Sequence, residues 1–542
     1  MRMKNLSTLI LSLIMAVLSV FAGCQKNEPQ AESQKQQPES YLNLVKACEE
    51  GKIFTSVDVA SASKKTVRFD DGTSIDVNAD DFEIFDCTEM SPLQVQAEGE
   101  YWTVGSIKLS VKVETSLQNK DASPVYVYYD YISIHMYLSN GVHLVSQKNW
   151  PERKNIPVIR IFTDGSASIN DKKNYVSGSI TVSDLEGLYT EEKVKNMRMG
   201  IRGRGNSTWS FPKKPWKVKL ESKAELLGMP ADKEWALLAN YADRTLVRNI
   251  VAMKLSEICG FSWTPRMRSV EVYLNGEYQG VYTLCEHKKV SKDRVNIDLV
   301  SEDDNDGDAV TGGYYLEIEQ QQDETTCWLT SMEVPMMFSD PEEPTAQQYE
   351  YIRNLFDSFE TALRNNDWSE ETGYPKYIDV DSFINYYIVQ ELVKNIDGNL
   401  RKSSFITKER GKKMEMYHLW DFDLTLGNCG YFEAGVGNGP ENFWIKQYKW
   451  YPYLFADPAF VEKLKNRWNE LMPELEKIPD FIDAQVYALG DAVDRNFQRW
   501  SINESVDWVQ FPSRGSYKKE VAYLKKFYSG RLKWLNTELN RL

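Results

Sequence analysis

Short runs of alternating apolar and polar residues fill the chain between residues 41 and about 150. An Asp-Gly pair separates two such runs in Phe69-Asp70-Asp71-Gly72-Thr73-Ser74-Ile75-Asp76-Val77, a pattern typical of a β-hairpin. Residues 125–129 and 132–138 continue the alternation. We therefore predict a small all-β domain over residues 41–150. No catalytic pattern is visible in it, so a spacer or docking role fits best.

A second unit is predicted over residues 155–542, and its first part is also rich in strands. In residues 216–220 the side chains of Trp216, Val218 and Leu220 share one face of a strand, and Lys217 and Lys219 share the other. Residues 269–284 form two apolar runs around Asn275-Gly276, which predicts a second hairpin. Residues 312–319 predict a further strand.

The later part of this unit changes to helical periodicity. Asp243 is a candidate N-cap for a helix that runs through Ile258, and Gly260 is its candidate C-cap. Five more helices are predicted from apolar spacing at residues 349–364, 381–394, 457–472, 484–500 and 517–542. The unit therefore reads as α+β, with a β-rich N-terminal half and an α-rich C-terminal half.

The first residues resemble a bacterial export signal. Arg2 and Lys4 precede an apolar run over residues 9–22, and small residues lead to Cys24, as in a lipobox. We expect residues 1–23 to be a lipoprotein signal peptide, although ordinary secretion with nearby cleavage is the alternative. Residues 24–40 are rich in Gln, Glu and Pro and predict a disordered tether. Because no aspartate follows Cys24, we expect an outer-membrane or cell-surface lipoprotein, anchored to the membrane by lipid at that cysteine.

Composition excludes some functions. The net charge of -15 argues against nucleic acid as a partner, because nucleic acid attracts clustered Lys and Arg. The seven cysteines show no CxxC spacing, so a zinc site has little support, and one disulfide outside the cytoplasm stays possible without a choice of pair. Four histidines and no GxSxG give little support to a serine hydrolase.

The strongest chemical signal is an apolar run that ends in two carboxylates. Residues 416–428 contain Asp421 and Asp423 followed by Gly427, and Asp397 lies in a turn 24 residues before Asp421. A strand that delivers one carboxylate, after a loop that delivers another, is how phosphotransferases hold a metal near an attacking hydroxyl. The pattern therefore predicts transfer of a phosphoryl group.

Basic and acidic segments offer weaker signals. Gly203-Arg204-Gly205 and the Lys217/Lys219 face would suit a phosphate clamp, but a solvated hairpin is the more common meaning of such a pattern. Arg244 and Arg248, four residues apart, would reach phosphate or a carboxylate, or form surface ion pairs. The acidic loop 302–308 would bind calcium or be a solvated loop, and its spacing matches no EF-hand.

Four motifs together resemble the spore coat protein H (CotH) kinase-like family. In chain order they are Gly203-Arg204-Gly205-Asn206-Ser207-Thr208-Trp209, Ala239-Asn240-Tyr241-Ala242-Asp243-Arg244-Thr245-Leu246-Val247-Arg248-Asn249, Gly280-Val281-Tyr282-Thr283-Leu284-Cys285-Glu286 and Trp420-Asp421-Phe422-Asp423. The likeness covers about residue 156 to the C-terminal helices and leaves residues 41–150 outside. It implies an atypical protein-kinase-like fold, ATP and Mg²⁺ or Mn²⁺ as cofactors, and protein hydroxyls as acceptors.

The resemblance also implies roles for single residues. Asp397 resembles the catalytic aspartate that orients or deprotonates the acceptor hydroxyl, and Asp421 resembles the metal-binding aspartate. Asn399 would complete the metal shell, although it lies closer to Asp397 than in other kinases, and Asp423 is either a second metal ligand or a turn cap. The resemblance assigns the phosphates to a loop and a strand, through Arg204, Asn206, Ser207 and either Lys217 or Lys219.

Three functions are compatible with these motifs. The first is an exported, lipid-anchored atypical protein kinase that transfers the γ-phosphate of ATP to Ser or Thr of exported or surface proteins. The second is a catalytically inactive kinase-like surface binding or adhesion lipoprotein. The third is a secreted metal-dependent hydrolase, in which the acidic residues would activate water.

Overall fold

The computed structural model describes residues 154–542 except 190–193, 322–325, 430–438 and 505–512, together with ten strands and a few neighbouring residues between 43 and 147. The predicted signal peptide, the predicted tether and Cys24 lie outside the described residues. None of the described helices is both long and apolar enough to cross a membrane. Two of the cysteines that the structure describes, Cys259 and Cys285, are buried free thiols.

The N-terminal strands form three antiparallel sheets. Strands β2 (Lys64–Phe69) and β3 (Ser74–Asn78) pair around the Asp-Gly turn, which confirms the predicted hairpin. The three sheets have the orders β1-β2-β3, β10-β9-β8-β4 and β5-β6-β7. The remaining strands are β1 (Phe54–Ser61), β4 (Glu83–Asp86), β5 (Val95–Glu98), β6 (Tyr101–Val104), β7 (Ile107–Lys112), β8 (Pro124–Tyr129), β9 (Ser133–Leu138) and β10 (His143–Gln147).

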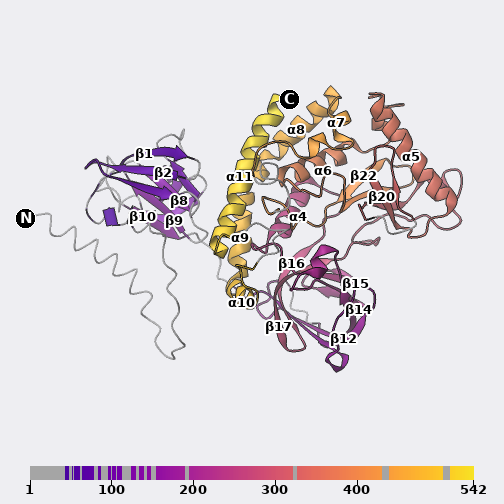
Figure 1. Cartoon of the computed structure of the whole chain (residues 1–542), viewed down its shortest axis with the longest axis horizontal. Coiled ribbons are helices and arrows are strands. Elements are labelled where there is room, and N and C mark those ends of the chain that lie inside the picture. Colours follow the sequence, from indigo (N-terminus) through magenta and orange to yellow (C-terminus); the bar gives the residue numbers. More distant parts are fainter. Residues whose placement is uncertain are drawn as a thin grey trace, which may run out of the picture.

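A closed barrel of seven strands begins the second unit (Figure 1). Its order is β11-β12-β13-β14-β15-β17-β16, and every pair is antiparallel except β11 with β16. The strands are β11 (Val158–Thr163), β12 (Val176–Ser183), β13 (Met197–Gly203), β14 (Trp216–Leu226), β15 (Met229–Leu238), β16 (Met267–Leu274) and β17 (Glu277–Glu286).

Local sequence explains much of the barrel. Along β14, Trp216, Val218 and Leu220 are buried in the barrel core, as the alternation predicts, and Trp216 stacks on Tyr282 with ring centroids 5.1 Å apart. The hairpin of β16 and β17 turns at Asn275-Gly276, where both residues have positive φ. Such φ values suit the tight turns that Asn-Gly favours, so this prediction is confirmed.

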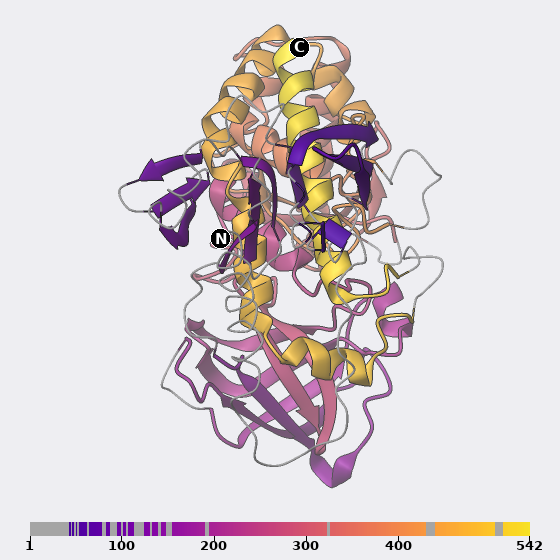
Figure 2. The same cartoon turned by 90° about the vertical axis from the view of Figure 1, so that its left-hand side faces the viewer.

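The C-terminal half combines helices with a five-stranded sheet of order β19-β20-β18-β21-β22 (Figures 1 and 2). The sheet contains β18 (Tyr314–Ile318), β19 (Trp328–Leu329), β20 (Pro335–Asp340), β21 (Ser404–Lys408) and β22 (Met414–His418). The helices are α4 (Arg248–Cys259), α5 (Ala346–Arg364), α6 (Val380–Leu392), α7 (Tyr451–Leu454), α8 (Pro458–Leu475), α9 (Ile478–Leu489), α10 (Ala492–Arg499) and α11 (Tyr517–Arg541).

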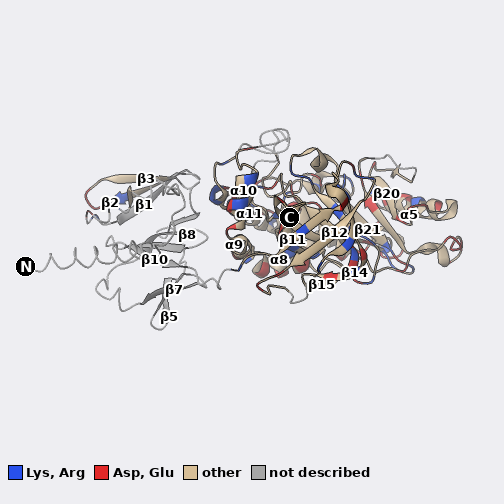
Figure 3. Cartoon of the chain, turned by 90° about the horizontal axis from the view of Figure 1, so that it is seen from below, with Lys and Arg blue, Asp and Glu red and all other residues tan. Residues whose placement is uncertain are grey.

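Helix α4 joins the two halves. In sequence it lies between barrel strands β15 and β16, but it packs against α6, α8 and α9 of the helical half. One continuous core of buried side chains therefore runs from α4 through the five-stranded sheet to α11. Figure 3 shows Lys and Arg interspersed with Asp and Glu over the described part of this unit.

Three sequence predictions need correction. The helix predicted over residues 484–500 is two helices, α9 and α10, interrupted at Gly490. Helix α4 begins at Arg248 and not directly after Asp243, because the buried Asp243 side chain accepts hydrogen bonds within a turn that precedes the helix. The strand predicted over residues 312–319 is confirmed as β18, but the sequence did not predict the five-stranded sheet that contains it. The mixed helix and sheet class is confirmed, whereas likeness to a protein kinase stays a prediction.

Candidate functional site

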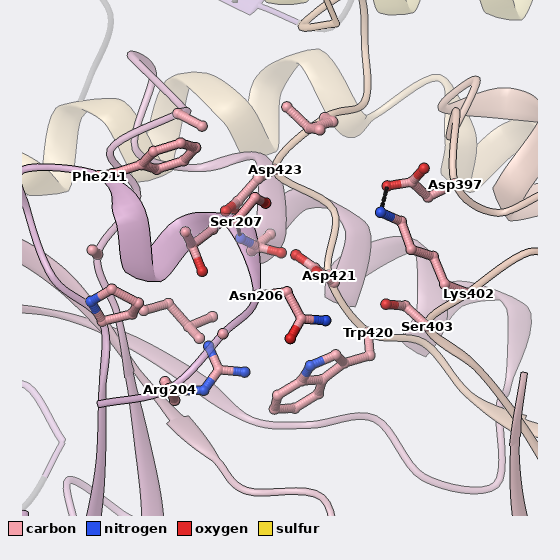
Figure 4. Close-up of a pocket in the computed structure, with 18 of the residues that line it drawn as sticks. Arg204, Asn206, Ser207, Phe211, Asp397, Lys402, Ser403, Trp420, Asp421 and Asp423 are labelled. Carbon is pink, nitrogen blue, oxygen red and sulfur yellow. Dashed lines mark hydrogen bonds and ion pairs between the residues drawn. The ribbon is translucent and has the colours of Figure 1, made fainter. Parts of the chain in front are cut away.

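A cleft of about 610 Å³ opens where the barrel, the N-terminal end of α4 and the loops of the helical half meet. Its walls come from segments far apart in the sequence (Figure 4). The barrel side contributes the loop after β13, and the helical side contributes the loops that follow α6 and β22. Charged and polar residues on these loops include Arg204, Asn206, Ser207, Lys213, Asp397, Lys402, Asp421 and Asp423.

The loop after β13 is shaped by two glycines, Gly203 and Gly205. A Cβ at Gly203 would lie 2.5 Å from the Trp209 ring, and Gly205 has a φ of +83° that side chains rarely adopt. This geometry turns Arg204 into the cleft, where its guanidinium lies 5.7 Å from the centroid of the Trp420 ring. Burial lowers the pKa of Arg204, and the negative charge of Asp421 opposes that shift.

Asn206 and Ser207 continue this loop along the same wall. Figure 4 shows them near Asp421, on the side of the cleft that also holds Arg204. The structure thus brings three of the predicted phosphate-binding residues, Arg204, Asn206 and Ser207, to the loop after β22, which carries Asp421 and Asp423.

Asp421 and Asp423 lie just beyond the end of β22. Asp421 has a φ of +65° and opens onto the cleft. Desolvation within the cleft raises the pKa of Asp421, Arg204 opposes this shift, and the negative charge of Asp397 adds to it. Burial, with the nearby charges of Asp421 and Asp243, raises the pKa of Asp423 to about 7. Two neighbouring carboxyls with raised pKa values favour a bound cation, which would relieve their mutual repulsion.

Residues in the first turn of α4 hold the loop after β22, which carries Asp421 and Asp423, by hydrogen bonds. Asn249 accepts a hydrogen bond from the backbone N–H of Phe422 at 2.8 Å, and its amide donates to the Asp423 carboxylate. Arg248 donates to the carbonyl of Thr425 at 3.0 Å. Sequence reasoning did not assign this role to Asn249. The only signal was its place at the end of a motif that also contains Asp243.

Asp397 lies in the loop that follows α6 and forms ion pairs with Arg401 and Lys402, the second at 3.1 Å. Figure 4 shows Lys402 reaching from the cleft wall to this carboxylate. The loop packs tightly at Gly398, where a Cβ would lie 2.2 Å from the side-chain oxygen of Gln390. Asp397 therefore occupies a defined position in the same cleft as Asp421.

Asn399 does not line the cleft. It is buried, and its Oδ1 has no hydrogen-bond partner among the described residues. A buried oxygen acceptor without a donor suits a cation, so its chemistry fits a metal ligand even though the cleft surface excludes it. The described residues contain no group of three His, Cys, Asp or Glu side chains able to hold a metal. Mg²⁺, which needs only one or two carboxylates when phosphates supply further oxygens, fits the pair Asp421 and Asp423.

Lys217 and Lys219 are not brought into the cleft. Lys217 forms an ion pair with Glu234 of the neighbouring strand at 2.6 Å, and Lys219 is exposed on the same outer face of the barrel. Other cations line the cleft, among them Lys288, which forms an ion pair with the buried Glu317. Sequence reasoning missed Lys288, because no local pattern distinguishes it from its neighbours after β17.

The structure shows the contacts of the arginines and of the loop 302–308, which the sequence left with open alternatives. Arg248 forms a buried ion pair with Asp243 at 2.5 Å, and the buried Arg244 donates to the carbonyls of Ile502 and Glu504. Arg248 thus reaches a carboxylate, and neither arginine is among the residues that line the cleft. In the loop 302–308, Asp304 accepts hydrogen bonds from Ser301 and forms an ion pair with Arg410 at 3.5 Å, and calcium binding there stays a prediction.

The fold and the cleft define an α+β protein that presents carboxylates from one half and an arginine loop from the other to a shared cavity. The match to a family model is specific: the chain belongs to the CotH kinase protein family, whose model matches residues 201–535. This span includes all four motifs that carry the resemblance. Comparison with curated proteins gives no match. Membership of the family indicates a kinase-like protein.

Proposed function

We propose that this protein is an atypical protein kinase that transfers the γ-phosphate of ATP to Ser or Thr hydroxyls of exported or surface proteins. The observation that supports this proposal most is that Asp397 and Asp421, from two separate loops, line one cleft. Their charges interact, since Asp397 contributes to the raised pKa of Asp421. Phosphoryl transfer needs such a pair, one carboxylate at the acceptor and one at the metal.

Each wall of the cleft has a role in this proposal. Asp397 would accept the proton of the acceptor hydroxyl or hold that hydroxyl in line with the phosphate. Asp421 and Asp423 would hold Mg²⁺ or Mn²⁺, which would neutralise charge on the phosphates, and Asn399 is left out of this metal site because it does not line the cleft. Arg204, Asn206 and Ser207 would donate hydrogen bonds to phosphate oxygens. We place Lys288 beside them as the cleft lysine, in place of Lys217 or Lys219.

The test is transfer of labelled phosphate from ATP to an added protein acceptor, with Mg²⁺ or Mn²⁺ present. We expect Asp397→Asn to slow transfer by roughly 10²- to 10⁴-fold, the range for general acid–base catalysis, and Asp421→Asn to abolish metal-dependent transfer. Asp381→Asn is the matched control, because Asp381 is an exposed acid on α6 that pairs with Lys463 outside the cleft.

Three results would count against this proposal. Transfer that is equal in wild type and Asp397→Asn would remove the role of this carboxylate. Release of phosphate from ATP, with no labelled protein under any condition, would favour a hydrolase. Binding of protein or glycan that ATP, metal and both substitutions leave unchanged would favour the inactive surface-binding alternative.

We further propose that the chain is exported and anchored in the outer membrane or at the cell surface through lipid on Cys24. The proposal rests on the signal-like residues 1–23 and the cysteine that follows them. Metabolic labelling with a radioactive fatty acid should label the wild type and not Cys24→Ser. Equal labelling of both chains would place the lipid elsewhere, and labelling of neither would favour ordinary secretion.

A further inference from the structure

A segment near the C-terminus crosses from the helical half onto the barrel. We call it the strap: helix α10 and the residues up to 504, which follow α9. Figures 1 and 2 show α10 beside β17, at the edge of the barrel. Arg495 of the strap forms a two-armed ion pair with Glu271 of β16, with both distances 2.8 Å. The indole of Trp500 donates to the carbonyl of Gln279 at 2.8 Å.

Asn496 is the buried centre of this contact. Its side-chain Oδ1 accepts hydrogen bonds from the backbone N–H of Val281 at 3.0 Å and from Nζ of Lys213 at 2.9 Å. Gly280 allows the approach, because a Cβ there would lie 2.6 Å from that same oxygen. One atom of the strap therefore joins β17 to the start of the segment that enters β14.

Lys213 connects this contact to the cleft. It lines the cleft, is buried, and also donates to the carbonyl of Val281. Its Nζ lies 4.6 Å from the centroid of the Tyr282 ring. Lys213 comes soon after the loop that carries Arg204, so its position limits where the C-terminal end of that loop can lie.

A second line of contacts runs from the strap to the same wall. Tyr241 lines the cleft, and the edge of its ring meets Trp500 with centroids 6.1 Å apart. On its other side Tyr241 lies 5.9 Å from the ring of Phe211, which also lines the cleft. Its hydroxyl donates to the carboxylate of Glu504 at 3.3 Å. The strap thus contacts the wall of the cleft that carries Arg204 at two points, through Lys213 and through Tyr241.

We propose that Asn496 is a positioning residue: by holding Lys213 and Val281 it fixes the wall that carries Arg204 and thereby sets the affinity of the cleft for a nucleoside triphosphate. The inference rests on the proposed function, because it assigns the cleft to a nucleotide. It adds a residue far along the chain that touches neither phosphate nor metal. Its effect should therefore be on binding of the nucleotide rather than on the chemical step.

The experiment compares three substitutions in the mature chain by titration with a fluorescent ATP analogue and Mg²⁺. Asn496→Ala removes the shared acceptor of Val281 and Lys213, and we expect a Kd about tenfold higher, which corresponds to about 1.4 kcal/mol. Asn496→Asp keeps an oxygen at the same place and should bind nearly as the wild type does. Gln498→Ala, on the exposed side of α10, is the matched control and should change nothing.

A second variant attacks the same contact from the barrel. Gly280→Ala leaves Asn496 in place but puts a methyl group against its oxygen, at a residue whose φ is +101°. It should raise Kd as Asn496→Ala does. In steady-state transfer assays both variants should raise KM for ATP and leave kcat nearly unchanged. A merely destabilising substitution would instead reduce the active fraction and therefore kcat.

Labelling with an amine-reactive reagent, in the absence of nucleotide, tests whether Asn496 keeps the Lys213 amine buried. Lys213 should be protected in the wild type and in Asn496→Asp, and become reactive in Asn496→Ala. Folded Asn496→Ala with wild-type Kd, KM and Lys213 protection would overturn the inference and leave the kinase proposal intact. Failure of the wild type itself to bind the analogue would overturn the nucleotide assignment, for Asn496 and for the proposed function alike.

Discussion

Acid should destabilise the folded protein through His418, the last residue of β22. This side chain is 1% exposed, and its ring stacks on Phe405 with centroids 4.3 Å apart. Its Nε2 lies 2.7 Å from the Tyr315 hydroxyl and its Nδ1 lies 3.1 Å from the carbonyl of Leu419. A neutral ring satisfies both contacts, with Nδ1–H as donor and Nε2 as acceptor. Burial lowers the pKa of His418 to about 3, from an ordinary value of 6.5.

The sign of the effect follows from proton binding. Between pH 6.5 and about 3 the unfolded chain binds a proton at His418 that the folded chain does not. Stability from this residue is therefore complete above pH 6.5 and is lost as the pH falls towards 3. The loss is about 1.4 kcal/mol per pH unit, and over the full window it reaches about 5 kcal/mol.

The assay is guanidinium unfolding, followed by tryptophan fluorescence at pH 7, 6, 5 and 4, of the wild type and His418→Gln. The variant should be less stable at pH 7, because glutamine cannot replace the stacked ring. The gap should then narrow with a slope that approaches about 1.4 kcal/mol per pH unit below pH 6, since only the wild type loses the histidine contribution. Other titrating groups are common to both chains and cancel in the difference. A gap that stays constant from pH 7 to pH 4 would refute the reasoning.

Three further predictions concern the site. Asn249→Ala removes both hydrogen bonds to the loop that carries Asp421 and Asp423. It should weaken binding of Mn²⁺, measured by electron paramagnetic resonance, about tenfold. Unchanged affinity would show that this loop keeps its position without Asn249. Asp243→Asn leaves the charge of Arg248 buried without its partner. It should lower the free energy of unfolding, measured by chemical denaturation, by about 3–5 kcal/mol, and a loss below about 1 kcal/mol would contradict this. Mg²⁺ with an ATP analogue at about 100 times Kd should stabilise the wild type by about 2.7 kcal/mol in thermal unfolding and leave Asp421→Ala unaffected, whereas equal stabilisation would remove Asp421 from the metal site.

The fold was predictable where the signal is local. The hairpin at Asn275-Gly276 is encoded by two residues with positive φ, and the buried face of β14 is encoded by alternation. The start of α4 was not predictable in this way. Asp243 has the side chain of an N-cap, but its hydrogen bonds go to Thr245 and Arg248 inside a buried turn. Whether Asp243 caps the helix or closes this turn depends on tertiary packing, which local helix propensity does not describe.

The candidate site shows the same division. Arg204 and Asp421 could be chosen from the sequence because glycines and the end of an apolar run mark them. The sequence could not exclude Lys217 from the phosphate site. Its ion pair with Glu234 depends on the pairing of β14 with β15 in the closed barrel, which no local pattern shows. Lys288 could not be found, because its partner Glu317 lies on a strand of a different sheet.

The charge arrangement in the cleft narrows the class of ligand. Asp421 and Asp423 form an acidic pair on one side, and Arg204 faces them from the barrel loop (Figure 4). An anion alone would pair with Arg204 but be repelled by the aspartates, and a cation alone would do the reverse. A metal bound to a polyphosphate carries both charges in one ligand and would meet each wall with the opposite sign. We therefore infer that metal and nucleotide bind together, and that affinity for each should rise when the other is present.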